Sequence, residues 1–196
     1  MFREKRRLAF YGGTFDPPHF GHLQMARAAR DHLRLHQVYF VPAGRNPLKD
    51  SGPCASAEHR LRMLRLALAG EAGFGIWEGE AFRPGPSYTL DSVEHIERVY
   101  PNCHLFWIIG SDQLVNLPRW HRIDRLAAKV GFILVRRPGH AFSWPAVPGL
   151  RLYPVDNQLH TASATDIRER VRDGRQIKAL TPPLVAGYIA DHGLYQ

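Results

Sequence analysis

The sequence predicts an α/β fold, a doubly wound parallel sheet with helices on both faces, in a single domain over residues 1–196. Short apolar runs alternate along the chain with segments of helical periodicity, which is the pattern of repeated strand–helix–strand units. Several of these runs are apolar almost throughout, as strands are when helices cover both faces of a sheet. The length fits one domain. The helical C-terminal portion, about 163–196, is expected to belong to it.

Six strands and six helices are expected. The strands are 7–11, 37–41, 74–78, 104–109, 130–135 and 150–155. The helices are 21–35, 57–69, 88–99, 121–128, 164–172 and 183–191. The last helix opens with two prolines and is followed by Gly193, which are typical start and stop signals.

Ligands of open parallel sheets bind beyond the carboxyl ends of the strands, at a topological switch point. Functional residues are therefore expected in the loops that follow strands. The loops 42–56 and 136–149 are long and rich in Pro and Gly. Either could close over a substrate, or be only a surface loop.

Charge and composition exclude some function classes. The chain has 26 Lys and Arg against 18 Asp and Glu, a net charge of +8 at pH 7, which suits an anionic partner without choosing one. It has no apolar run near the roughly 20 residues of a membrane helix, so no membrane partner is expected. It also has no basic stripe interleaved with aromatic residues, so nucleic acid is not an expected partner.

The two cysteines, Cys54 and Cys103, are far apart and form no C-x-x-C. They make neither a disulfide framework nor a zinc knuckle, which indicates a cytoplasmic protein. The oligomeric state is left open between a monomer and a homo-oligomer.

The segment "GGTFDPPHFGH" at 12–22 is the strongest local signal. Gly12 and Gly13 end a predicted strand, where backbone without a Cβ can approach a phosphate closely. His19 and His22 lie three apart where the next helix begins, so both rings can face the same way and donate hydrogen bonds to phosphate oxygens. Two histidines could instead be metal ligands, but no third ligand is evident nearby. The spacing therefore favours a phosphate site.

This segment resembles the H-x-G-H signature of the nucleotidyltransferase superfamily, and within it the nicotinate/nicotinamide mononucleotide adenylyltransferases. Four later segments are similar to the same family and extend the resemblance over nearly the whole chain: "SYTLDSV" (87–93), "FWIIGSDQLVNLPRWHRIDRL" (106–126), "ILVRRPG" (133–139) and the region 163–195. One departure is "NPLK" (46–49), where Leu48 replaces the family's histidine and Asn46 a proline.

The resemblance implies a Rossmann-like sheet and adenylyl transfer from ATP to nicotinate mononucleotide in NAD biosynthesis, giving nicotinate adenine dinucleotide and pyrophosphate. The attacking phosphate is already an anion, so catalysis should consist of positioning and charge stabilisation. Mg²⁺ would be held mainly by phosphates and water. The alternatives are a nicotinamide-mononucleotide-preferring enzyme, a phosphopantetheine adenylyltransferase and, from a different class, a nucleic-acid-binding module.

The resemblance also implies roles for residues of this chain. The catalytic residues would be His19, His22 and Arg168. The ATP-binding residues would be Gly12, Gly13, Thr14, Phe15, His19, His22, Gly110, Asp112, Ser163, Thr165, Ile167 and Arg168. The mononucleotide-binding residues would be Lys49, Tyr88, Thr89, Asp112, Trp120 and Arg137.

Several of these residues have a structural alternative. Ser163 and Thr165 could cap a helix, Asp112 could be the N-cap of a short helix, and Trp120 could pack in the core. Asp16 is expected to hold the glycine loop through backbone amides, with a water-mediated magnesium contact as its alternative. Arg136, next to Arg137, could meet phosphate or equally face solvent.

Overall fold

A computed structural model describes residues 5–44, 52–136, 144–156 and 162–196. Its strands are β1 (Arg6–Gly13), β2 (Gln37–Pro42), β3 (Phe74–Ile76), β4 (Cys103–Gly110), β5 (Gly131–Val135) and β6 (Leu152–Val155). They form one sheet in the order β3-β2-β1-β4-β5-β6, and every neighbouring pair is parallel. The strand order reverses between β1 and β4, which makes that boundary the topological switch point.

The helices are α1 (Phe20–His32), α2 (Ala57–Ala67), α3 (Thr89–Val99), α4 (Ser111–Leu114), α5 (Ile123–Lys129), α6 (Ala164–Arg172) and α7 (Pro183–Asp191). Two 3₁₀ turns accompany them, η1 (Glu78–Glu80) and η2 (Leu117–Arg119). Each of the six expected strands and helices is present, with ends shifted by a few residues. The short helix α4 was expected only in the alternative that Asp112 caps a short helix. The turns η1 and η2 were not expected, because three residues are too short to show a helical period.

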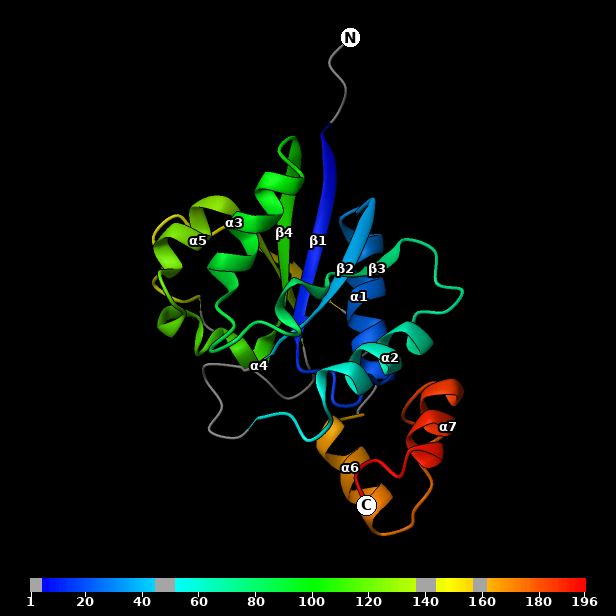
Figure 1. The fold of residues 1–196 in the computed structure, drawn as a ribbon. Helices are drawn as coiled ribbons and strands as arrows, with labels where there is room; N and C mark the ends of the chain where they lie inside the picture. Colours follow the sequence, from blue (N-terminus) through cyan, green and yellow to red (C-terminus); the bar gives the residue numbers. More distant parts are fainter. Residues whose placement is uncertain (1–4, 45–51, 137–143, 157–161) are drawn as a thin grey trace.

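Helices cover both faces of the sheet, which confirms the predicted fold class (Figure 1). Side chains alternate along β1, so Leu8 and Phe10 join the cluster that contains residues of α3 and α5. Ala9 and Tyr11 join the opposite cluster, which contains residues of α1. The strand is thus buried on both faces, as its nearly continuous apolar run predicted.

The C-terminal helices α6 and α7 lie beyond the carboxyl ends of β1 and β4, next to α2 (Figure 1). They share a third apolar cluster with α2, which includes Met63, Ile167, Val185 and Ile189. Thr181 Oγ1 also donates to the carbonyl of Pro18 at 2.7 Å. The C-terminal portion is therefore packed against the segment that leads into α1. Within the described ranges, no helix is both long and apolar enough to span a membrane.

Candidate functional site

The glycine turn, residues 12–16 at the carboxyl end of β1, lies at the switch point of the sheet. A Cβ added to Gly12 would lie 2.6 Å from a ring atom of Trp107, and one added to Gly13 would lie 2.8 Å from the ring of Phe15. The protein's own rings therefore already require glycine here, besides any phosphate that approaches the backbone. Phe15 has a positive φ of 50° and its side chain is buried, so only its backbone is available at the turn.

His19 and His22 form one unit at the start of α1. His19 is the N-cap of the helix, and its ring stacks on that of His22 with centroids 3.6 Å apart and planes 24° apart. The backbone N–H of His19 donates to Nδ1 of His22 at 3.3 Å, which leaves Nε2 to carry the proton of a neutral His22 ring. The expectation that the two rings face the same way is confirmed.

Gly21 makes this stacking possible. A Cβ at position 21 would lie 3.1 Å from two atoms of the His19 ring and 3.3 Å from the carbonyl oxygen of Ala162. The His22 ring in turn meets Phe15 edge-on, with centroids 5.0 Å apart. The histidine pair is therefore held by close contacts with its neighbours.

The side chain of Asp16 is held by three hydrogen bonds. Its buried carboxylate accepts hydrogen bonds from the backbone N–H groups of Cys54, at 2.6 Å, and Ala55, at 3.2 Å, and from the hydroxyl of Tyr195, at 2.6 Å. Asp16 thus accepts from backbone amides, as predicted. The predicted partner was wrong, because these amides belong to residues 54 and 55 rather than to the glycine loop.

Arg168 reaches the same turn from α6. Its Nη1 donates to the main-chain oxygen of Asp16 at 2.8 Å, and its Nη2 donates to Oγ1 of Thr165 at 3.4 Å. The guanidinium is therefore anchored beside the segment that carries the histidines, 152 residues away along the chain.

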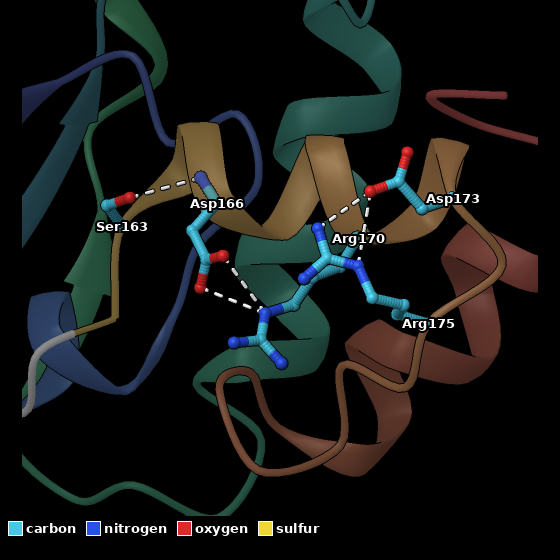
Figure 2. Close-up of polar contacts among 5 residues, drawn as sticks. All are labelled: Ser163, Asp166, Arg170, Asp173 and Arg175. Atoms are coloured by element: carbon cyan, nitrogen blue, oxygen red, sulfur yellow. Dashed lines mark hydrogen bonds and ion pairs between the residues drawn. The ribbon is translucent and has the colours of Figure 1, made fainter.

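The start of α6 is capped by Ser163, whose Oγ accepts from the N–H of Asp166 at 3.1 Å (Figure 2). The capping alternative for Ser163 is confirmed. Along the same helix Arg170 pairs with Asp166 at 3.0 Å, and Arg175 pairs with Asp173 at 2.7 Å just beyond its end (Figure 2). These two arginines are neutralised locally, whereas Arg168 is directed to the turn.

The side chain of Ile167 is fully buried in the third apolar cluster. Only its backbone can therefore meet a nucleotide. Thr165, in contrast, is exposed in the first turn of α6.

Several residues expected to bind ATP or the mononucleotide lie at the end of β4, just after it, and at the start of α3. Gly110 ends β4 and is itself the N-cap of α4, so the alternative that Asp112 is that cap is wrong; Asp112 is exposed in the first turn. Tyr88 is the N-cap of α3 and stacks on His121 with centroids 4.4 Å apart, and Thr89 begins the helix.

Trp120 is half-buried, and its structural alternative, packing against the core, is confirmed for part of the ring. One part of its ring packs against the core, where it meets Phe132 edge-on with centroids 6.2 Å apart. The remainder is accessible. A ring held in this way is able to offer a surface to a planar ligand.

Four residues of the sequence predictions, Asn46, Leu48, Lys49 and Arg137, lie outside the described residues. Arg136, which precedes Arg137, is exposed and forms an ion pair with Asp156 at 2.9 Å.

Sequence reasoning missed Arg60, which is 1% exposed. Its Nη1 donates to the carbonyl oxygens of Thr14, at 2.9 Å, and Ala43, at 2.8 Å, which follow β1 and β2. Burial lowers the pKa of this guanidinium, and the charge of Asp16 opposes that shift. The sequence did hold one indication that Arg60 is buried: it lies on the apolar face of α2, four residues before the buried Leu64.

Among the described residues, no group of three or more His, Cys, Asp or Glu side chains is arranged to hold a metal ion. The oxygens of Asp16, the carboxylate nearest the histidine pair in sequence, already accept from three donors. The donor set around the turn thus suits an anion better than a cation.

Comparison with known proteins gives consistent matches over nearly the whole chain. Residues 10–170 match the family model described as cytidylyltransferase-like. A protein of Geobacillus kaustophilus named "Probable nicotinate-nucleotide adenylyltransferase" is 42% identical over 192 residues, covering 96% of this chain and 86% of the relative. One of the same name from Thermomicrobium roseum is 41% identical over 198 residues, covering 97% and 92%.

Solved structures agree on the fold. The nicotinic acid mononucleotide adenylyltransferase of Plasmodium falciparum complexed with NaAD superposes with a TM-score of 0.79 at 19% identity, covering 97% of each chain. The same enzyme complexed with APC gives a TM-score of 0.76 at 18% identity, again covering 97% of each chain.

Proposed function

The chain belongs to the family of nicotinate-nucleotide adenylyltransferases, and on that premise we propose how its residues transfer the adenylyl group of ATP to nicotinate mononucleotide. The products are nicotinate adenine dinucleotide and pyrophosphate, a step of NAD biosynthesis. The observation that carries the proposal is the stacked pair His19 and His22 at the N-terminus of α1, with Arg168 anchored to the same turn.

An oxygen of the mononucleotide phosphate attacks the α-phosphorus of ATP. The bond from that phosphorus to the bridging oxygen breaks, and pyrophosphate leaves with the electron pair. The nucleophile is already ionised, so no general base is needed. The protein's task is to align the two substrates and to stabilise the charge that develops on the phosphates.

His19 and His22 are proposed to donate hydrogen bonds to the α-phosphate and to the leaving pyrophosphate. They sit where the amides and the positive dipole end of α1 favour an anion. Donors fixed in advance need no reorganisation during the reaction, which is why one such donor is commonly worth about 10²–10³ in turnover. Arg168 is proposed to meet the β- and γ-phosphates.

Around these side chains, the backbone of Gly12, Gly13 and Phe15 would line the phosphate path together with Thr14. The remaining ATP contacts are proposed for Gly110, Asp112, Ser163, Thr165 and the backbone of Ile167.

We propose that Mg²⁺ would be bound by the phosphate oxygens of ATP and by water molecules, which suits an ion that dehydrates reluctantly. It would supply neutralising charge to the phosphates. The described residues offer no protein cage for it.

The mononucleotide is proposed to bind on the other side of the switch point. Trp120 would stack on the pyridine, Tyr88 and Thr89 would border it, and Asp112 would accept ribose hydroxyls. Lys49 and Arg137 are proposed to meet phosphate. Nicotinate is the proposed preference, in keeping with the curated relatives.

Both cysteines have free thiols, which supports a reducing compartment such as the cytoplasm. The proposed partners are these small molecules rather than nucleic acid or a membrane.

The test is pyrophosphate release by the purified protein with ATP and Mg²⁺, run in parallel with nicotinate mononucleotide, nicotinamide mononucleotide and phosphopantetheine. We expect turnover with nicotinate mononucleotide well above that with the other two acceptors. Equal or faster turnover with nicotinamide mononucleotide would overturn the proposed preference. Silence with both mononucleotides, from a folded protein that binds ATP, would overturn the proposed reaction.

A further inference from the structure

The end of the C-terminal region returns to the glycine turn. Gly193 has a positive φ of 57°, and Tyr195, two residues later, has one of 68°. The chain therefore folds back on itself after α7. The Tyr195 hydroxyl then reaches Oδ1 of Asp16 at 2.6 Å, across 179 residues of sequence. Tyr195 lies in the region 163–195 that resembles the family, yet the proposed reaction gives it no role.

Asp16 connects this tyrosine to the site. Its carboxylate accepts from Tyr195 and from the amides of residues 54 and 55, while its main-chain oxygen accepts from Arg168 at 2.8 Å. Asp16 therefore accepts a hydrogen bond from the Tyr195 phenol on its side chain and one from the Arg168 guanidinium on its main chain. A shift of the Asp16 main chain would move the acceptor that anchors Arg168.

The contact between Tyr195 and Asp16 is strong for a physical reason. Burial raises the pKa of the Tyr195 phenol, and the Asp16 carboxylate raises it further, so the phenol remains a proton donor at any working pH. Asp16 is 4% exposed, and a buried carboxylate needs several donors. A neutral hydroxyl that donates to a carboxylate forms one of the shorter and stronger hydrogen bonds.

We infer that Tyr195 is a positioning residue for adenylyl transfer, which fixes Asp16 and thereby the place where Arg168 presents its guanidinium to the ATP phosphates. This inference rests on the proposed function, since it assigns Arg168 to ATP. Tyr195 itself touches neither substrate. Its removal acts by displacing a group that does, and small displacements of such groups can cost up to about 10²-fold.

Tyr195→Phe tests this because it removes only the hydroxyl. The matched control is Tyr188→Phe in α7, whose hydroxyl shares a hydrogen bond with Nδ1 of His59 at 2.8 Å rather than with Asp16. We expect Tyr195→Phe to raise the dissociation constant for ATP and to lower kcat/KM for ATP, each by about tenfold. Tyr188→Phe should leave both near wild type, while the melting temperatures of the two variants stay close to each other.

The route through Arg168 is tested by repeating Tyr195→Phe in an Arg168→Ala background. Calorimetric titration of ATP in the absence of acceptor measures affinity for all four proteins. We expect the effect of Tyr195→Phe to fall below about twofold once Arg168 is gone, because coupled residues are not additive. An unchanged affinity in Tyr195→Phe, or an equal loss in both backgrounds, would overturn the inference.

This design separates two kinds of failure. Wild-type protein that binds ATP but transfers nothing to a mononucleotide contradicts the proposed function alone. The ATP titrations still decide whether Tyr195 acts through Arg168, because they need no acceptor.

Discussion

The rings of His19 and His22 stack with centroids 3.6 Å apart, and His19 is the N-cap of α1. The backbone N–H of His19 donates to the His22 ring, so the position of one histidine depends on the main chain of the other. The pair is thus built into the helix start, where an anion is favoured.

Replacing His19 by alanine should lower turnover by about 10²–10³-fold, because a fixed donor to the reacting phosphates is lost. The backbone N–H that holds His22 remains, so we expect little change in the circular dichroism spectrum. The measurement is steady-state pyrophosphate release. His104→Ala is the control, since His104 is exposed near the amino end of β4, whereas the histidine pair lies beyond the carboxyl end of β1. Near wild-type turnover in His19→Ala would contradict the role given to this residue.

Replacing Gly21 by alanine should reduce kcat by about tenfold or more, because the new methyl group would press on the His19 ring from 3.1 Å. Gly187→Ala in α7 is the matched control, since a Cβ there meets nothing within 4 Å. Ala is favoured over Gly in a helix interior, so the control should gain about 1 kcal/mol in the free energy of unfolding with unchanged turnover. Wild-type kinetics in Gly21→Ala would show that the ring stacking is not needed.

The sheet could be predicted because buried parallel strands leave continuous apolar runs, as in "LAFY" of β1 and "FILV" of β5. The histidine pair could be predicted because its members are neighbours in sequence. Arg60 and Tyr195 could not, since their hydrogen bonds to the turn cross 46 and 179 residues. No local pattern encodes which distant backbone atoms will meet a side chain.

The free energy of unfolding should fall by about 2–4 kcal/mol when Arg60 is replaced by methionine. Methionine fills similar space but leaves the carbonyls of Thr14 and Ala43 without the charged donor. Hydrogen bonds to charged groups contribute about 1.5–3 kcal/mol each, and this loss is partly offset because methionine avoids the cost of burying a charged guanidinium. Urea denaturation measures the effect. Arg62→Met, at an exposed position of the same helix, should change stability by less than about 0.5 kcal/mol. Equal losses in both variants would contradict the role of Arg60 as a link between the strand ends.

Glu80 in η1 is 3% exposed, and its carboxyl group accepts a hydrogen bond from the hydroxyl of Ser92. Burial raises its pKa above the ordinary value of 4.5, and the Ser92 hydrogen bond and the charge of Arg83 reduce that shift without cancelling it. The folded protein therefore binds more protons at this site than the unfolded chain does.

The contribution of Glu80 to stability is accordingly largest below pH 4.5 and decreases as pH rises through its raised pKa. Glu80→Gln keeps an acceptor for Ser92 but cannot ionise. We expect the free energy of unfolding of Glu80→Gln, relative to wild type, to increase between pH 4 and pH 7 in urea titrations. Glu78→Gln, two residues away and exposed, serves as the surface control. A difference between Glu80→Gln and wild type that stays constant over this range would mean that Glu80 titrates alike in the folded and unfolded chain.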